Sequence, residues 1–266
     1  MPKVKVGDIN IYYEVHGKGE PLVMICGHGA NTELYSGFIP VYSREYRLVL
    51  FDNRGAGKSD APDIPYTIEK MADDMSGLLD AIGIRSAHIW GASMGGMIAQ
   101  QFALRYPERV RSLILACTCC GGPLGKLSDE SIKFMKQRKN MNPKEMVEEM
   151  LRLSITQEFA EKNPELIQNI ISVFLEHPTP TQGQTRQEQA IIKHNTYKRL
   201  SEIKAPTLIL HGEADKSISA KNAQILAHRI PNAQLLIFAN TGHMLLEALD
   251  ELNKTTLDFL RRHRAG

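Results

Sequence analysis

A serine between two glycines, where an apolar run passes into a helical segment, constrains the fold of this chain most strongly. Residues 91–95 read Gly-Ala-Ser-Met-Gly, after an apolar run over 87–90 and before a helical pattern over 96–104. A strand that turns directly into a helix strains the backbone of the central residue and lifts its side chain clear of the sheet. A Cβ at either glycine would collide with the neighbouring strand or helix. The segment therefore predicts an exposed nucleophile, Ser93, at a helix N-terminus.

Short apolar runs alternate with amphipathic segments along most of the chain. Continuous apolar runs are typical of strands buried on both faces, and apolar residues at helical spacing indicate helices. We expect strands at residues 3–6, 9–15, 22–26, 48–51, 87–90, 110–116, 207–211 and 234–238. We expect helices at residues 67–82, 96–104, 219–228 and 245–262. This order predicts an α/β fold with a mostly parallel sheet, helices on both faces and ligands beyond the carboxyl ends of the strands.

The pattern changes between residues 121 and 203, where strand-like runs are absent from the sequence. Helical segments are expected there at residues 128–138, 143–153, 164–175 and 182–197. We predict a helical cap (residues 121–203) inserted into an α/β core formed by residues 1–120 and 204–266. Its flexible apolar side chains either line a substrate pocket or pack the cap helices together. They are Phe134, Met135, Met141, Met146, Met150, Leu153, Phe159 and Phe174.

An acid and a histidine follow later strands in the order that a serine nucleophile requires. A serine hydroxyl needs a base, and the base needs an acid to orient it. Asp215 lies in the loop after strand 207–211, and His243 lies in the loop after strand 234–238. Both should emerge at the same sheet edge as Ser93, so we predict these three residues as a catalytic triad. Glu213 is a rival acid, and His211 is expected to be a core or loop histidine.

The site also needs two hydrogen-bond donors for a developing oxyanion. One prediction is the N–H of Met94, directly after the serine. The other is the N–H of Ala30, in the glycine-containing loop of residues 27–30 that follows strand 22–26. A phosphate-binding role is the alternative for that loop, but the Gly-x-Gly-x-x-Gly and Walker patterns are absent from the sequence.

Composition narrows the function classes. The 266 residues carry 32 basic and 30 acidic side chains, a net charge of +2, which gives no global field for nucleic acid or anionic lipid. The N-terminal residues lack an apolar run of signal-peptide length, and we expect a cytoplasmic protein without membrane spans. We expect the four cysteines, Cys26, Cys117, Cys119 and Cys120, to be free thiols, in preference to a disulfide framework or a metal site.

Several motifs together resemble the α/β-hydrolase superfamily over essentially the whole chain. They are His28-Gly29, Asp52-x-Arg54-Gly55-x-Gly57-x-Ser59, Gly91-x-Ser93-x-Gly95-Gly96, Arg105-Tyr106-Pro107-Glu108-Arg109-Val110, Ala205-Pro206-Thr207, His211-Gly212-x-x-Asp215 and Gly242-His243. Within the superfamily the chain is similar to small bacterial carboxylesterases and to enol-lactonases of the 3-oxoadipate type. The resemblance implies a serine hydrolase that cleaves a small, apolar ester or lactone through an acyl-enzyme, with no metal or cofactor.

Other activities share the same fold and triad. They are cofactor-free perhydrolysis, C–C bond hydrolysis of diketones and thioester cleavage, and the sequence leaves them open. A ligand receptor or signalling protein on this fold is an alternative from a different class. Serine at position 93, where relatives with other chemistry have aspartate, argues against epoxide hydrolase and haloalkane dehalogenase activity. The oligomeric state stays open.

Overall fold

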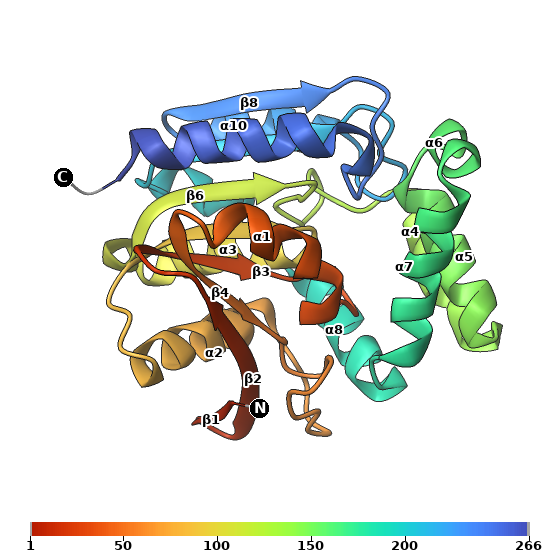
Figure 1. The fold of residues 1–266 in the computed structure, drawn as a ribbon, viewed down its shortest axis with the longest axis horizontal. Helices are drawn as coiled ribbons and strands as arrows, with labels where there is room; N and C mark the ends of the chain where they lie inside the picture. The colour runs from red at the N-terminus through yellow and green to blue at the C-terminus, as the bar shows by residue number, and fades with distance from the viewer. Residues whose placement is uncertain (1, 265–266) are drawn as a thin grey trace.

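A single mixed sheet forms the centre of the molecule. The computed structural model describes residues 2–264, which form an eight-stranded sheet in the order β1-β2-β4-β3-β5-β6-β7-β8 (Figure 1). The strands are β1 (Lys3–Val6), β2 (Ile9–His16), β3 (Glu20–Ile25), β4 (Tyr46–Phe51), β5 (Ala87–Ala92), β6 (Val110–Ala116), β7 (Thr207–Gly212) and β8 (Ala233–Phe238). Strand β2 pairs antiparallel with β1 and β4, and all pairs from β4 to β8 are parallel. The predicted α/β-hydrolase fold class is confirmed.

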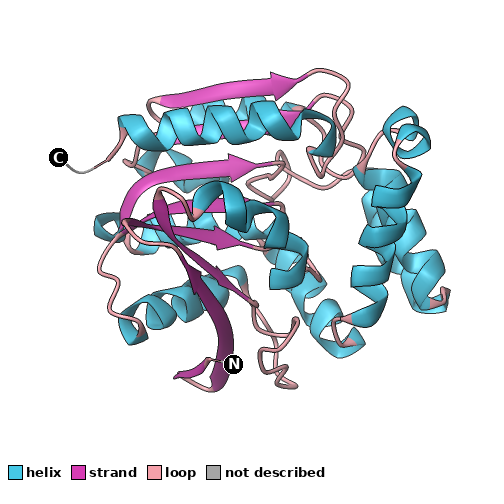
Figure 2. Cartoon of the chain, viewed as in Figure 1, coloured by secondary structure: helices cyan, strands magenta, loops and turns pink. Residues whose placement is uncertain are grey.

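Helices cover both faces of the sheet, as Figure 2 shows. One buried apolar cluster packs α2 (Ile68–Ala81), α3 (Met94–Arg105) and α9 (Lys221–Arg229) on one face. A second cluster packs α1 (Ile39–Tyr42) and α10 (Leu249–Arg262) on the other face. Burial on both faces explains why the central strands read as continuous apolar runs in the sequence.

The parallel strands all end at one edge of the sheet, and the helices between β6 and β7 lie beyond that edge (Figure 1). These helices are α4 (Asp129–Gln137), α5 (Pro143–Ser154), α6 (Gln157–Lys162), α7 (Pro164–Glu176) and α8 (Thr181–Lys193). We call residues 121–203 the helical insertion. The described part of this segment contains no regular strand, in keeping with the sequence pattern.

Three helix predictions need correction. The insertion contains the short helix α6 in addition to the four expected helices; Thr156 caps it by accepting a hydrogen bond from the N–H of Phe159. Helix α8 ends at Lys193 rather than residue 197, because the backbone is already extended at His194. The last helix begins at Leu249 rather than residue 245, because Leu245 has a left-handed conformation with a φ of 56°. Helix α6 was not predicted because its six residues are too few to show a helical period.

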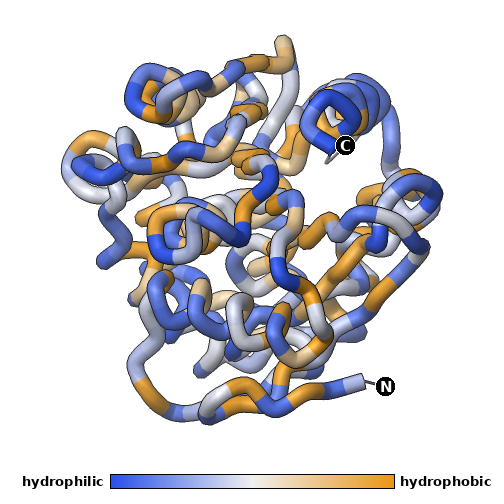
Figure 3. Tube along the Cα trace, turned by 90° about the vertical axis from the view of Figure 1, so that its left-hand side faces the viewer, coloured by the Kyte–Doolittle hydropathy of each residue, from blue (hydrophilic) through white to orange (hydrophobic). Residues whose placement is uncertain are grey.

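None of the helices that the structure describes has the length and hydropathy needed to span a lipid bilayer. Figure 3 shows hydrophobic and hydrophilic residues interspersed along the trace rather than gathered into one long apolar segment.

The segments that leave and re-enter the core at the base of the insertion are joined by backbone hydrogen bonds. The N–H of Thr196 donates to Cys120 O at 2.8 Å, and the N–H of Gly122 donates to His194 O at 3.1 Å. The His194 side chain is buried at this junction, and burial lowers its pKa to about 3. The imidazole is therefore neutral in the folded protein at pH values well above 3.

This burial predicts an acid-labile junction. Unfolding restores a histidine pKa of about 6.5, so the unfolded state binds more protons below that pH, and stability is lost as pH falls from 6.5 toward 3. The free energy of unfolding should drop by about 2 kcal/mol from this group between pH 7 and pH 5. Urea unfolding of wild type and His194→Gln at both pH values measures the effect. An equal drop in both proteins would contradict it.

Candidate active site

Ser93 stands at the sharp turn between β5 and α3. Its backbone has a φ of 54° and a ψ of −120°, a conformation that non-glycine residues rarely adopt. A Cβ on Gly95 would lie 2.1 Å from Ile25 O in β3, and one on Gly91 would lie 2.3 Å from Gly95 O. Both flanking positions therefore require glycine, as the sequence analysis expects. The close approach of helix and strand forces the turn and directs Ser93 outward.

Asp215 and His243 form a hydrogen-bonded pair at the ends of β7 and β8. The Nδ1 atom of His243 lies 2.7 Å from Asp215 Oδ2. Asp215 is buried, whereas the His243 side chain keeps 14% of its surface exposed. Burial raises the pKa of Asp215, but the adjacent His243 and the hydrogen bonds to the carboxylate outweigh it and hold that pKa well below its usual range. The carboxylate is thus ionised and can stabilise a protonated imidazole.

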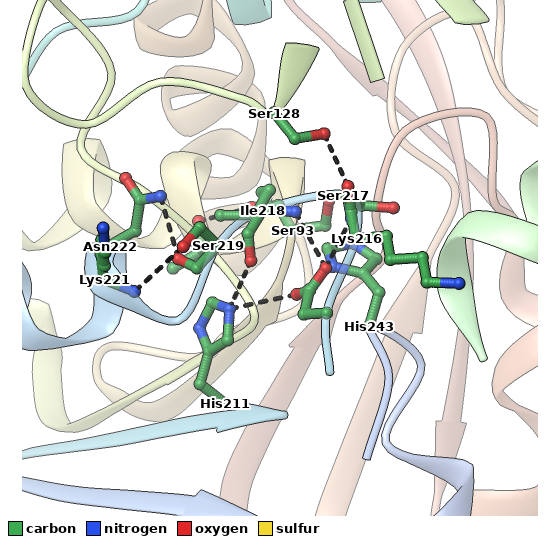
Figure 4. Close-up of polar contacts among 12 residues, drawn as sticks. Ser93, Ser128, His211, Lys216, Ser217, Ile218, Ser219, Lys221, Asn222 and His243 are labelled. Atoms are coloured by element: carbon green, nitrogen blue, oxygen red, sulfur yellow. Dashed lines mark hydrogen bonds and ion pairs between the residues drawn. The ribbon is translucent and has the colours of Figure 1, made fainter. Parts of the chain in front are cut away.

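The loop around Asp215 supplies further donors to the same carboxylate. The N–H groups of Ser217 and Ile218 each donate to Asp215 Oδ1 at 2.8 Å. His211 Nε2 lies 3.1 Å from Asp215 Oδ2 and donates to Ile218 O at 2.7 Å. Figure 4 shows His211 and His243 in this network together with Ser93. The sequence analysis assigned His211 no function; its place four residues before the acid is the signal that links it to the site.

Contacts at the end of β6 also connect Ser93 to this pair. The N–H of Ser93 donates to Ala116 O at 2.9 Å. The next residue, Cys117, has its Sγ within 4.8 Å of the side-chain ligand atoms of Asp215 and His243. The structure therefore brings the serine, acid and histidine that the sequence singles out to one edge of the sheet. Glu213 is exposed and contacts Asn240 instead, so it does not orient the histidine.

The thiol of Cys117, at this edge of the sheet, is not activated as a thiolate. Cys117 is buried, and burial raises the pKa of its thiol well above the ordinary value, with the nearby Asp215 adding to the effect. A metal ion would have to displace the proton shared by Asp215 and His243 to use these ligands. All four cysteines are buried free thiols.

Two loops offer donors for an oxyanion beside Ser93. Met94 is the first residue of α3, where backbone N–H groups have no partner within the helix. The N–H of Ala30, the predicted second donor, lies in a turn, 3.3 Å from Gly27 O, which is long for a hydrogen bond. The N–H of Gly29 donates to Gln187 Oε1 at 2.9 Å. The loop comes close to the serine, because a Cβ on Gly27 would lie 3.4 Å from Ser93 Cβ. The N–H groups of Ala30 and Met94 stay the predicted oxyanion donors.

The helical insertion contacts the histidine and acid loops directly. The N–H of Met244 donates to Ser154 O at the end of α5, at 2.9 Å. A Cβ on Gly242 would lie 2.6 Å from the same oxygen. The N–H of Thr156 donates to Glu247 Oε1 at 2.7 Å. The loop that carries His243 is therefore fixed from the core side and from the insertion side.

The fold and the placement of Ser93, Asp215 and His243 at one sheet edge are those expected of a hydrolase, and comparisons with known proteins agree on the family. The family model described as alpha/beta hydrolase fold matches residues 20–248. The chain belongs to the α/β-hydrolase family.

Individual relatives differ in the reactions that their names describe. The chain is 31% identical to a 2-hydroxy-6-oxononadienedioate/2-hydroxy-6-oxononatrienedioate hydrolase of Burkholderia vietnamiensis, covering 96% of this chain and 92% of the relative. It is 31% identical to a poly(3-hydroxyalkanoate) depolymerase of Ectopseudomonas oleovorans, covering 92% of this chain and 85% of the relative. Its structure resembles the enol-lactonase of Burkholderia xenovorans LB400 with a TM-score of 0.88 at 25% identity, covering 98% and 100% of the two chains.

The geometry predicts that substitutions of Asp215 and Glu213 have different effects on kcat. Asp215→Asn keeps the shape but permits the wrong imidazole tautomer, which costs about 10⁴ in kcat in the best-studied triad. Glu213→Gln should leave kcat within about twofold of wild type, because the exposed carboxylate does not touch His243. Steady-state kinetics of both variants on an ester that the wild type cleaves make the comparison. The reverse ranking would move the role to Glu213.

Proposed function

We propose that this protein is a serine hydrolase that cleaves a carboxylic ester or lactone through an acyl-enzyme. The observation that carries the proposal is the pairing of His243 Nδ1 with the buried Asp215 carboxylate at 2.7 Å, beside a serine on a strained turn. This pairing leaves the other ring nitrogen of His243 for the serine hydroxyl. It also sets the proton on Nδ1, so that the unprotonated Nε2 can act as a base.

The proposed reaction has two halves. Ser93 Oγ attacks the substrate carbonyl while His243 takes its proton, and the N–H groups of Met94 and Ala30 bind the resulting oxyanion. His243 then returns the proton to the departing alkoxide, which leaves Ser93 acylated. A water molecule, activated by His243, attacks the acyl group and releases the acid and the free serine. Asp215 holds the imidazole and stabilises its charged form in both halves.

The choice of esters and lactones is supported by the relatives. A poly(3-hydroxyalkanoate) is a polyester, and an enol-lactone is a cyclic ester, so the names of the relative from Ectopseudomonas oleovorans and of the structural neighbour both describe action on an acyl–oxygen bond. The helical insertion, as a cap over the site, would supply the pocket, and its apolar residues favour a small apolar substrate. The proposal includes a cytoplasmic location, supported by four cysteines that are all free thiols.

Hydrolysis of a C–C bond is the second candidate. The relative from Burkholderia vietnamiensis supports it at the same 31% identity as the polyester depolymerase. Both reactions use an activated oxygen nucleophile and an oxyanion site, so the triad does not separate them. The substrate does: a 2-hydroxy-6-oxo-dienoate is coloured and loses its absorbance when its C–C bond is cleaved.

A labelling experiment tests whether Ser93 is the nucleophile. A fluorophosphonate probe should modify wild type at one site, and Ser93→Ala should abolish both the label and hydrolysis, by several orders of magnitude in kcat. Ser201→Ala, at an exposed serine in the insertion, is the matched control and should behave as wild type. Peptide mapping locates the label. A Ser93→Ala variant that keeps a tenth of the wild-type kcat would refute the assignment.

A substrate panel then separates the two candidates. We expect wild type to cleave p-nitrophenyl esters of short and medium acyl chains, and small lactones, with higher kcat/KM than a 2-hydroxy-6-oxo-dienoate. The reverse order would favour C–C hydrolysis. Labelling of Ser93 without turnover on any member of the panel would instead favour a ligand receptor on this fold.

A further inference from the structure

The loop that carries the proposed oxyanion donor Ala30 is held by the helical insertion. Residues 27–31 follow β3 in the core, and residues 177–187 lead into α8 and form its first half. Four hydrogen bonds join them: His28 Nε2 to Gln184 O at 3.1 Å, Gly29 N to Gln187 Oε1 at 2.9 Å, Thr179 Oγ1 to Gly29 O at 2.8 Å, and Asn31 Nδ2 to His177 O at 3.1 Å. Both polar backbone groups of Gly29 therefore depend on the insertion.

Gln187 makes the most demanding of these contacts. Its side chain is fully buried in α8, and both ends of its amide are used. The Oε1 atom accepts from the N–H of Gly29, and Nε2 donates to Arg54 O at 2.9 Å. Arg54 lies in the loop after β4, so one side chain bridges two core loops. A buried backbone group that loses such a partner has no water to replace it.

The position of Gln187 is set by a backbone contact one helical turn earlier. A Cβ on Gly183 would lie 2.0 Å from Gly55 O, so the helix touches the core loop without an intervening side chain. Residues four apart share a helix face, so Gly183 and Gln187 both face the core loops. Helix α8 therefore has little freedom to shift relative to the loop that it contacts.

The contacts fix the backbone of the loop next to its predicted donor. Gly29 O and the N–H of Ala30 belong to one planar peptide group and point in opposite directions. Thr179 Oγ1 donates to Gly29 O, which sets that plane, and Gln187 holds the preceding plane through the N–H of Gly29. Gly29 has a φ of 65°, a region that glycine enters freely, so the loop alone does not fix this geometry.

We propose that Gln187 is a positioning residue for catalysis: by bridging Gly29 and Arg54 it keeps the N–H of Ala30 directed at the oxyanion. This inference rests on the proposed function. Gln187 acts through the loop and does not touch the substrate. The donor strengthens its hydrogen bond as charge develops on the oxygen, so its misalignment lowers kcat and leaves KM nearly unchanged.

The expected loss of kcat can be estimated from the effect of removing a donor in other oxyanion sites. Complete loss of one donor costs about 10²–10³ in kcat. Gln187→Met removes both amide contacts at nearly constant length but leaves the donor in place, so we expect kcat to fall about 10–100-fold. KM should stay within about twofold, and the affinity for a boronic acid that mimics the tetrahedral intermediate should fall by a factor similar to that for kcat.

The matched control is Gln189→Met, at an exposed glutamine two residues along the same helix. It should leave kcat, KM and boronate affinity unchanged. Hydrogen–deuterium exchange of the 27–31 segment gives a readout that does not need activity, and Gln187→Met should speed exchange there. If Gln187→Met does not fold, Thr179→Val removes only the contact to Gly29 O and should shift kcat and boronate affinity in the same direction.

The outcomes separate this inference from the proposed function. A wild type that is not labelled at Ser93 and hydrolyses nothing overturns the proposed function and the positioning role with it. An active wild type whose Gln187→Met variant keeps its kcat and boronate affinity overturns the positioning role alone. A fall in kcat with unchanged boronate affinity and unchanged exchange also overturns it, because the donor would then be unaffected.

Discussion

The close backbone approach of α3 to β3 is the constraint on which the rest of the site depends. No side chain, not even a methyl group, fits between Gly95 and Ile25 O, where a Cβ would lie at 2.1 Å. The strand must therefore turn within one residue, and Ser93 takes the strained conformation at that point. The same geometry aims the N–H of Met94 and the positive end of the helix dipole at the space beside the serine. The strained turn, the exposure of the proposed nucleophile and the position of one proposed donor therefore follow from a single contact.

The other proposed catalytic groups lie on loops, which need support that the sheet alone does not give. The end of α5 hydrogen-bonds the loop of His243, and α8 hydrogen-bonds the loop of Ala30. The insertion thus contacts the site on the side of the base and on the side of the oxyanion donor. These contacts are polar and directional, so they fix orientation in a way that apolar packing does not. A change in the insertion can consequently alter catalysis without any contact to the substrate.

The sequence predicted those parts of the structure that local patterns determine. Apolar runs located all eight strands, and the glycines around Ser93 indicated the sharp turn, because both signals arise from burial and close approach within a few residues. Helix α6 was missed because it is too short to show a period. The support of the loop that carries Ala30 was not predicted, because a side chain far away in sequence holds the N–H of Gly29; the bond spans 158 positions. No local pattern carries that information.

The acid of the site depends mainly on partners that are close in sequence. A buried carboxylate is costly unless each oxygen accepts hydrogen bonds. Asp215 Oδ1 accepts from two backbone donors of its own loop, and Oδ2 accepts from His243. The side chain of His211, whose Nε2 donates to Ile218 O, lies 3.1 Å from Oδ2. The backbone donors hold the carboxylate in place, and only His243 comes from another loop. The charge that stabilises a protonated His243 is therefore held rigidly in place before any substrate binds.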